Sequence, residues 1–265
     1  MKTLVCPVDF SDTSENAAHY AARIARDLNA ELVLAHALHV PILDAQTPPV
    51  AVKDMMDQQQ LENSKKLDEL ASRIKSTVGG DIRTWQTFGL VVDMIREISD
   101  ETSIFLVVMG TRGATNAIDK WVGTTSSDVM ARCELPMLIV PDGAIYTGWP
   151  KVGYATDFKR DSDDTILDFQ ELVRPMGSDL TILHVAKNKV DADELLAVVK
   201  HFELHASVVT LSSEDVTQEL NDYVWENDLH LIGLKRHKRN FIQNLFHKSI
   251  TKELAISSKM PVLIF

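Results

Sequence analysis

Two segments of this chain repeat one another, and this repeat constrains the fold more than any other feature. Residues 152–158 echo residues 5–10, with an Asp-Phe pair at the end of each, and in both copies a histidine (His36, His184) follows the aspartate after 27 positions. Each copy ends in a proline-led apolar run: 136–140 and 261–265. Because matches in register of this kind mark repeated structural units, the sequence predicts two copies of one domain.

Within the first copy, short apolar runs alternate with segments typical of helices. Apolar runs bounded by Gly, Pro or polar clusters favour strands buried on both faces, and their alternation with helices implies βα units and a parallel sheet. The predicted strands are 4–8, 31–38, 82–88, 104–109 and 136–140, and the predicted helices are about 12–28, 53–77, 89–101 and 126–133. Residues 41–52 are predicted to be a loop and residues 141–150 a linker. The predicted domains are therefore 1–145 and a shorter 146–265.

The composition suits a globular protein and argues against several functional classes. The 265 residues are enough for two cores, and the formal net charge of −11 argues against nucleic-acid binding, which needs clustered Lys and Arg. No apolar run approaches the ~18–20 residues of a membrane span, and residues 1–9 reach a charge too early for a signal peptide. The two cysteines, Cys6 and Cys133, are too few for a disulfide framework. We interpret both as reduced packing residues in a cytoplasmic protein.

The loop after the fourth predicted strand holds the best candidates for a binding site, since open α/β sheets bind ligands at such loops. Gly110 lets the chain turn off the strand, and Gly113 lets a ligand approach the backbone. Gly123 removes a side chain before the next helix. Thr124 and Thr125 add hydroxyls beside the free amides of that helix start, which favour an anion such as phosphate.

In their spacing, Gly110, Gly113, Gly123 and Thr124 resemble the nucleotide-binding signature of the ATP-binding branch of the universal stress proteins. Together with the repeat, the resemblance covers nearly the whole chain and implies a tandem form. It implies two doubly wound (Rossmann-like) α/β domains, each with a five-stranded parallel sheet. It also implies a stress-response or regulatory protein that binds ATP, with or without Mg²⁺. The site residues that it implies are Pro7, Val8, Asp9, Ala37, Met109, Gly110, Gly113, Gly123, Thr124 and Thr125.

The same resemblance implies a role for each of these residues. Asp9 and the two residues before it would lie near the adenine or the ribose, and the backbone of Ala37 would contact the adenine. Met109 and Gly110 would line the ribose side. The remaining glycines and threonines would hold the phosphates.

Asp9 and the two histidines also have structural interpretations. An aspartate after a first strand can cap the following helix, a role for which Ser11 and Asp12 are further candidates, or it can be a partner for a backbone amide. Asp157 repeats this aspartate in a copy that lacks the glycines. A histidine at a strand end is more often a satisfied core residue than a ligand, and its presence in both copies favours the structural role.

The second copy lacks most of the glycine pattern. Gly233 corresponds to Gly110, whereas Arg236 and Lys248 stand where the other two glycines would be, and Ser249 keeps the hydroxyl. Long side chains obstruct the backbone approach that binds phosphate, so we expect one ATP per chain. The basic run 235–239 is either a solvated loop or an anion site built from side chains.

The last strand of each copy is apolar and nearly uncharged, which suits a buried seam better than a solvated edge. Family members that this chain resembles pair these strands antiparallel across a dimer two-fold. We therefore predict an internal pseudo-dimer with Leu138 and Leu263 at or near the interface. A homodimer is a further possibility, and the protein partners are left unassigned.

Signatures of several enzyme classes are absent from the sequence. It contains no P-loop, no G-x-S-x-G motif and no paired general acid and base. We therefore assign no catalytic residue and no metal site. Two alternatives stay open beside ATP-dependent regulation: an interaction scaffold that binds no nucleotide, and a slow nucleotide hydrolase.

Overall fold

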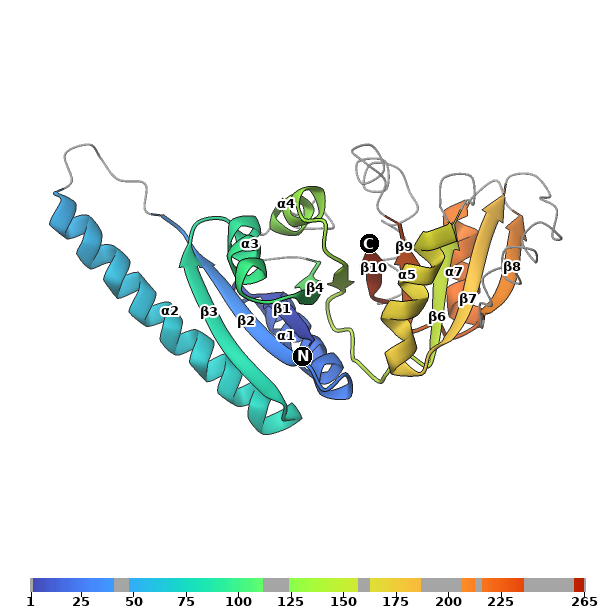
Figure 1. Cartoon of the computed structure of the whole chain (residues 1–265), viewed down its shortest axis with the longest axis horizontal. Helices are drawn as coiled ribbons and strands as arrows, with labels where there is room; N and C mark the ends of the chain where they lie inside the picture. Colours follow the sequence, from blue (N-terminus) through green and yellow to red (C-terminus); the bar gives the residue numbers. More distant parts are fainter. Residues whose placement is uncertain are drawn as a thin grey trace. The chain divides into compact units, whose positions relative to one another are not determined.

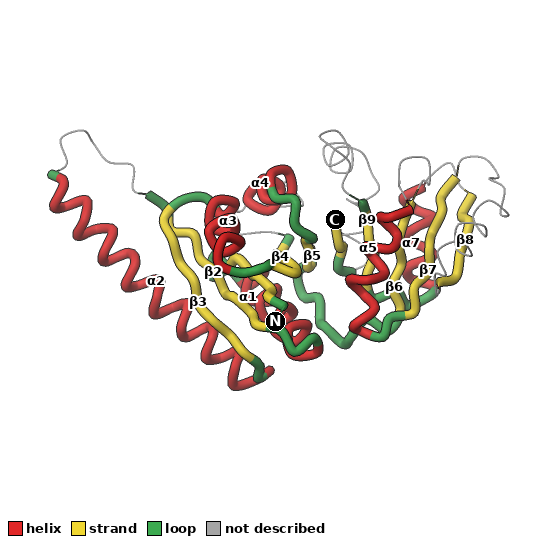
Figure 2. Tube along the Cα trace, viewed as in Figure 1, coloured by secondary structure: helices red, strands yellow, loops and turns green. Residues whose placement is uncertain are grey.

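The structure is a computed structural model that describes residues 2–40, 48–111, 124–156, 163–186, 206–212, 216–235 and 260–264 (Figures 1 and 2). The chain divides into two compact units, Met1–Leu135 and Pro136–Phe265. The structure bears out the α/β class and a mostly parallel sheet, and each unit is described here by itself.

Unit 1 is an alternation of strands and helices. Its strands lie in the order β3-β2-β1-β4, and each neighbouring pair is parallel. The elements are β1 (Thr3–Pro7), α1 (Asp12–Asp27), β2 (Glu31–Leu38), α2 (Pro49–Val78), β3 (Asp81–Phe88), α3 (Val91–Glu101), β4 (Ile104–Gly110) and α4 (Thr124–Arg132). Each predicted strand and helix of this region is present.

The helices of unit 1 cover both faces of the sheet, with α1 and α2 on one face and α3 and α4 on the other (Figure 1). Two β3 threonines show this at the level of side chains. The Thr84 hydroxyl donates to Asp68 of α2, whereas the Thr87 hydroxyl donates to Glu97 of α3. Because successive strand residues point to opposite faces, positions three apart contact helices on opposite sides. Unit 1 is therefore doubly wound.

Helix α1 packs against the sheet through small side chains. Its buried positions include the predicted alanine face, Ala18, Ala21, Ala22 and Ala25, all at most 3% exposed. Short side chains let the helix backbone approach the strands closely. This close approach brings the first turn of α1 to the end of β4.

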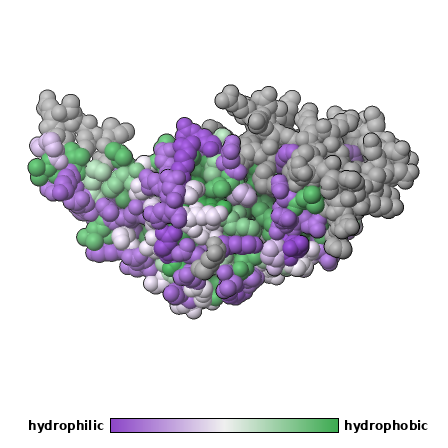
Figure 3. All heavy atoms as spheres, in the orientation of Figure 1, coloured by the Kyte–Doolittle hydropathy of each residue, from purple (hydrophilic) through white to green (hydrophobic). Residues whose placement is uncertain are grey.

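Helix α2 begins at Pro49, inside the segment 41–52 that was predicted to be a loop. Proline is well suited to a first helical turn, because its missing N–H has no intrahelical acceptor there and its φ is already helical. The buried side chains of α2 (Leu67, Leu70, Ile74) all lie in its second half. In Figure 3, polar and apolar residues are interspersed along the visible surface of this helix.

Unit 2 contains a six-strand array in the order β5-β10-β9-β6-β7-β8. Its elements are β5 (Met137–Val140), β6 (Lys151–Thr156), α5 (Asp163–Val173), the short 3₁₀ helix η1 (Arg174–Met176), β7 (Asp179–Ala186), β8 (Ala206–Ser212), α7 (Val216–Glu226), β9 (Leu231–Leu234) and β10 (Val262–Ile264). The five strands from β10 to β8 are mutually parallel, as predicted for the second copy.

Strand β5 has the partner that was predicted for it, because it pairs antiparallel with β10. The predicted first domain, 1–145, includes this strand, whereas the division into compact units places it in unit 2. Leu138 lies opposite Leu263, and both side chains are fully buried. The antiparallel pairing of the two final strands is therefore confirmed, while the boundary between domains at residue 145 stays a prediction.

The predicted linker 141–150 is a packed segment. Tyr146 and Trp149 are buried and contact each other edge to face, with ring centroids 6.0 Å apart. The Tyr146 hydroxyl donates to the sulfur of Met176 in unit 2 at 3.7 Å. The two aromatic rings therefore fix a stretch whose glycines and prolines suggested a free connection.

Both cysteines are buried free thiols, as the sequence predicted, and burial raises the pKa of the Cys6 thiol. In the part of the chain that the structure describes, no helix combines the length and the apolar character needed to cross a membrane.

Candidate functional site

The strand order of unit 1 reverses between β1 and β4. The chain runs from β1 outward through β2 to β3 and then returns to form β4 on the other side of β1. The switch point of an open α/β sheet, at the carboxyl ends of such a strand pair, is where these folds usually bind ligands, and it is called here the switch-point crevice. Pro7 ends β1 and Gly110 ends β4, so the predicted residues on these strands meet at this crevice.

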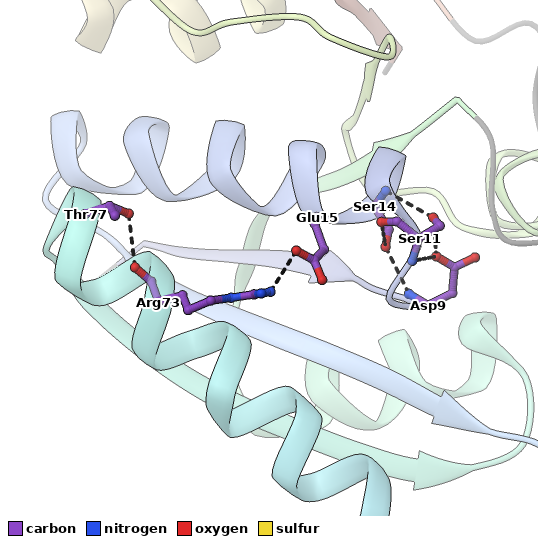
Figure 4. Close-up of polar contacts among 6 residues, drawn as sticks. All are labelled: Asp9, Ser11, Ser14, Glu15, Arg73 and Thr77. Atoms are coloured by element: carbon purple, nitrogen blue, oxygen red, sulfur yellow. Dashed lines mark hydrogen bonds and ion pairs between the residues drawn. The ribbon is translucent and has the colours of Figure 1, made fainter.

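Asp9 fixes the turn between β1 and α1 (Figure 4). Its Oδ1 accepts hydrogen bonds from the backbone N–H of Ser11 at 3.1 Å and from the Ser11 hydroxyl at 2.6 Å. Ser11 is the N-cap of α1, and its Oγ accepts from the Ser14 N–H. Ser11 is therefore the cap, and Asp9 is the partner of a backbone amide through one carboxylate oxygen, while its other oxygen points away from Ser11 in Figure 4.

The first turn of α1 is also joined to α2. The carboxylate of Glu15, in the first turn of α1, forms an ion pair with Arg73 of α2 at 2.7 Å (Figure 4). Both side chains are about one-third or more exposed, so this pair contributes little to stability by itself. It does fix which side of α1 faces α2.

His36 holds the end of β1 against β2. Its Nδ1–H donates to the carbonyl oxygen of Val8 at 2.7 Å, and its ring lies 4.6 Å from that of Phe10. Phe10 has a left-handed backbone, with φ of 62°, which a large residue adopts only where its surroundings enforce it. Burial lowers the pKa of His36, while the Val8 carbonyl and the Asp9 carboxylate raise it in part. We infer a neutral imidazole at pH 7 that acts as a structural donor.

Unit 2 contains the same hydrogen bond. The Nδ1–H of His184 donates to the carbonyl oxygen of Thr156 at 3.1 Å, and this contact spans the same 28 residues as that of His36. Since the bond is present in both copies, the repeated histidine joins the first two strands of each. The structural interpretation of the histidines is confirmed.

Ala37 lies in a part of β2 that extends past β1. Pro7 is the last β1 residue paired with β2, opposite Ala35, whereas β2 continues to Leu38. The Ala35 carbonyl accepts from Val8 and the Leu38 carbonyl accepts from Gly89 after β3. Because backbone groups alternate in direction along a strand, those of Ala37 point to the side where β1 has ended. This is the direction that a contact with a ligand in the crevice requires.

Gly110 is enclosed by two elements that the sequence interpretation did not connect with it. A Cβ at this position would lie 2.8 Å from Cγ2 and 2.9 Å from the carbonyl oxygen of Thr13 in α1. On its other side, the Gly110 carbonyl accepts a hydrogen bond of 3.1 Å from the buried hydroxyl of Ser126 in α4. Gly110 is therefore required for packing, in addition to any contact with a ligand. Thr13 and Ser126 were missed because nothing local in the sequence reveals a partner so distant along the chain.

The remaining predicted residues are only partly described. Gly113 and Gly123 lie outside the described residues, as do Arg236, Lys248, Ser249 and most of the basic run 235–239. Thr124 is the first residue of α4, and Thr125 follows it with an exposed side chain. The start of α4 thus lies two residues before Ser126, whose bond fixes it beside the end of β4.

Gly233 of unit 2 has a packing partner of another kind. A Cβ at this position would overlap the ring of Phe169 in α5. The ring is fully buried and also packs on Tyr154, with centroids 5.3 Å apart. The glycine that corresponds to Gly110 thus accommodates an aromatic side chain in the second copy.

Comparisons with known proteins agree with this geometry. The family model described as the universal stress protein family matches residues 1–141. Two relatives are a universal stress protein of Methanocaldococcus jannaschii, 28% identical over 52% of this chain and 81% of its own length, and one of Synechocystis, 25% identical over 53% and 85%. A crystal structure of a universal stress protein from Archaeoglobus fulgidus aligns with a TM-score of 0.74 at 19% identity, covering 99% of this chain and 95% of the other. The last match shows that the fold is shared along the whole chain.

Proposed function

The chain belongs to the universal stress protein family, and we propose that it is a regulatory protein that binds ATP in unit 1. The site lies at the carboxyl ends of β1, β2 and β4. We propose ATP with or without Mg²⁺ as the ligand and one molecule per chain.

One observation supports this proposal above the others: residues far apart in the sequence converge on one edge of the sheet. Asp9 follows β1, Ala37 lies where β2 extends past β1, and Gly110 ends β4. The switch point of a doubly wound sheet is the usual location for a nucleotide. The resemblance of Gly110, Gly113, Gly123 and Thr124 to the nucleotide-binding signature of the family supports ATP as the ligand.

Within this site, each group has a role that its chemistry allows. The Asp9 carboxylate accepts hydrogen bonds, which suits the ribose hydroxyls, and the backbone of Ala37 suits the polar edge of adenine. Gly113, Gly123, Thr124 and Thr125 are proposed to surround the phosphates with backbone amides and hydroxyls. We assign no catalytic residue, and we propose that ATP acts as a signal more than as a substrate.

The second copy is proposed to support the first without binding nucleotide. β5 ends the first sequence copy and β10 ends the second, and their antiparallel pairing supports an arrangement of the copies as an internal pseudo-dimer. The Phe169 ring occupies the space over Gly233, which gives that glycine a reason to be present without a ligand.

Calorimetry and extraction together test this function. The purified chain is titrated with ATP, GTP and adenosine, and a second sample is extracted with acid and analysed by mass spectrometry for nucleotide. We expect saturable ATP binding with one site per chain. A folded chain that neither binds ATP nor releases a nucleotide would favour the scaffold, whereas turnover well above that of a Gly123→Asp variant would favour the hydrolase.

A further inference from the structure

The hydrogen bond between Ser126 and Gly110 connects the two ends of the glycine loop. Ser126 is the third residue of α4, Gly110 is the last residue of β4, and 16 positions separate them. The Ser126 side chain is only 5% exposed, so the bond is shielded from competing water. The bond fixes the separation between the strand end and the helix start.

Helix α1 packs closely against Gly110 on the side away from Ser126, and this packing limits movement of the Gly110 backbone. The carbonyl oxygen of Thr13 would lie only 2.9 Å from a Cβ at Gly110, so the helix backbone approaches this glycine closely. Thr13 in turn belongs to the first turn of α1, whose N-cap Ser11 is bonded to Asp9. The Gly110 carbonyl is thus a fixed acceptor, and Ser126 is the member of the pair that can adjust.

A second serine shows that the geometry of Ser126 is not the usual one for a helix. Ser99 in α3 donates to the Ile95 carbonyl of its own helix at 2.9 Å, a local bond common for helical serines. Ser126 instead donates to a carbonyl outside α4. Its hydroxyl therefore orients the helix relative to the strand and does not merely satisfy a local acceptor.

We propose that Ser126 is a positioning residue of the nucleotide site: through its bond to the Gly110 carbonyl it holds the start of α4 where the phosphates bind. This inference rests on the proposed function. Ser126 itself touches no ligand in this scheme. Its effect should therefore depend on the phosphates of the ligand, because the adenine and ribose are held by residues on β1, β2 and β4.

The test measures ATP and adenosine affinities of the full chain by calorimetry for wild type, Ser126→Ala and the matched control Ser99→Ala. Loss of a buried hydrogen bond gives an expected weakening of ATP binding by Ser126→Ala of about tenfold. Adenosine binding should be unchanged, and Ser99→Ala should bind both ligands as wild type does. Equal weakening for ATP and adenosine would indicate general loosening of unit 1 and would overturn the inference.

A second variant keeps the test decisive if Ser126→Ala fails to fold. Ser126→Cys keeps nearly the same volume but replaces the hydroxyl with a weak donor, so ATP affinity should fall several-fold while adenosine affinity is retained. Wild-type ATP affinity in a folded Ser126→Cys or Ser126→Ala variant would overturn the inference alone. Absence of ATP binding by wild type would overturn the proposed function, and the inference with it.

Discussion

The two copies differ in the size of the side chains with which their first helix packs on the sheet. In the register that aligns Asp9 with Asp157, buried Ala21 of α1 corresponds to buried Phe169 of α5. In unit 2 the ring of Phe169 packs over Gly233, whereas in unit 1 the corresponding glycine, Gly110, is approached by the backbone of Thr13 in α1. The same glycine position thus accommodates a helix backbone in one copy and an aromatic side chain in the other.

What the copies share is structural, and what they do not share points to function. Both contain the histidine bonded to the end of the first strand. Both also have a left-handed residue after the first helix, Asn29 in one copy and Gly177 in the other. The glycine pattern after the fourth strand occurs in the first copy alone. Comparing the two copies thus separates the residues that the fold requires from those that the proposed nucleotide site requires.

The largest effect is expected from Phe169→Ala, which gives unit 2 the side chain that unit 1 has at Ala21. Truncating this fully buried ring leaves a cavity next to Gly233 and should lower the free energy of unfolding by about 3–5 kcal/mol. Trp225→Ala is the matched control, because Trp225 is 59% exposed and its loss should matter little. Equal stability of the two variants in urea unfolding would contradict the role of this ring in the core of unit 2.

The next largest effect is expected when side chains are added to the glycine loop. Gly113→Val or Gly123→Asp is expected to weaken ATP binding by about 100-fold or more, equivalent to about 2.7 kcal/mol, because a side chain obstructs the phosphates. The carboxylate adds like-charge repulsion. Calorimetry measures the affinity, and thermal unfolding checks that the fold is retained. Unchanged affinity in both folded variants would remove the phosphate site from this loop.

The paired glycines Gly110 and Gly233 allow a sharper comparison. Gly110→Ala and Gly233→Ala should each destabilise the protein by about 1–3 kcal/mol through overpacking. The obstacle at Gly110 includes the Thr13 backbone, so Thr13→Ala should not rescue Gly110→Ala. The obstacle at Gly233 is a side chain, so Gly233→Ala should cost nothing further in a Phe169→Ala background. Double-mutant cycles by chemical unfolding measure both, and rescue at Gly110 would refute the distinction.

The smallest effect concerns the pH dependence of His36. Its pKa is lowered by burial in the folded state, so the unfolded chain binds more protons as the pH falls below the ordinary histidine range. The stability due to neutral His36 is thus complete above about pH 6.5 and is lost as the pH falls through the folded pKa. His36→Leu should flatten this part of the profile. Parallel profiles of unfolding free energy between pH 7 and 5 for wild type and variant would contradict a buried neutral imidazole.

The sequence alone determined the elements of this protein and their type. Apolar runs, the alanines of α1 and the repeated Asp-Phe and His positions depend on spacing along the chain, so the α/β class, the parallel strands and the two copies were predictable. The same applies to the grouping of Asp9 and Gly110, because parallel strands place their carboxyl ends at one edge.

Tertiary structure alone decided which distant groups meet. Three contacts join residues far apart in the chain: the Thr13 backbone against Gly110, the Ser126 hydroxyl on the Gly110 carbonyl, and the Phe169 ring over Gly233. Such contacts depend on how closely each helix approaches the sheet. That distance is set by the summed volumes of many side chains, and no local pattern in the sequence records it.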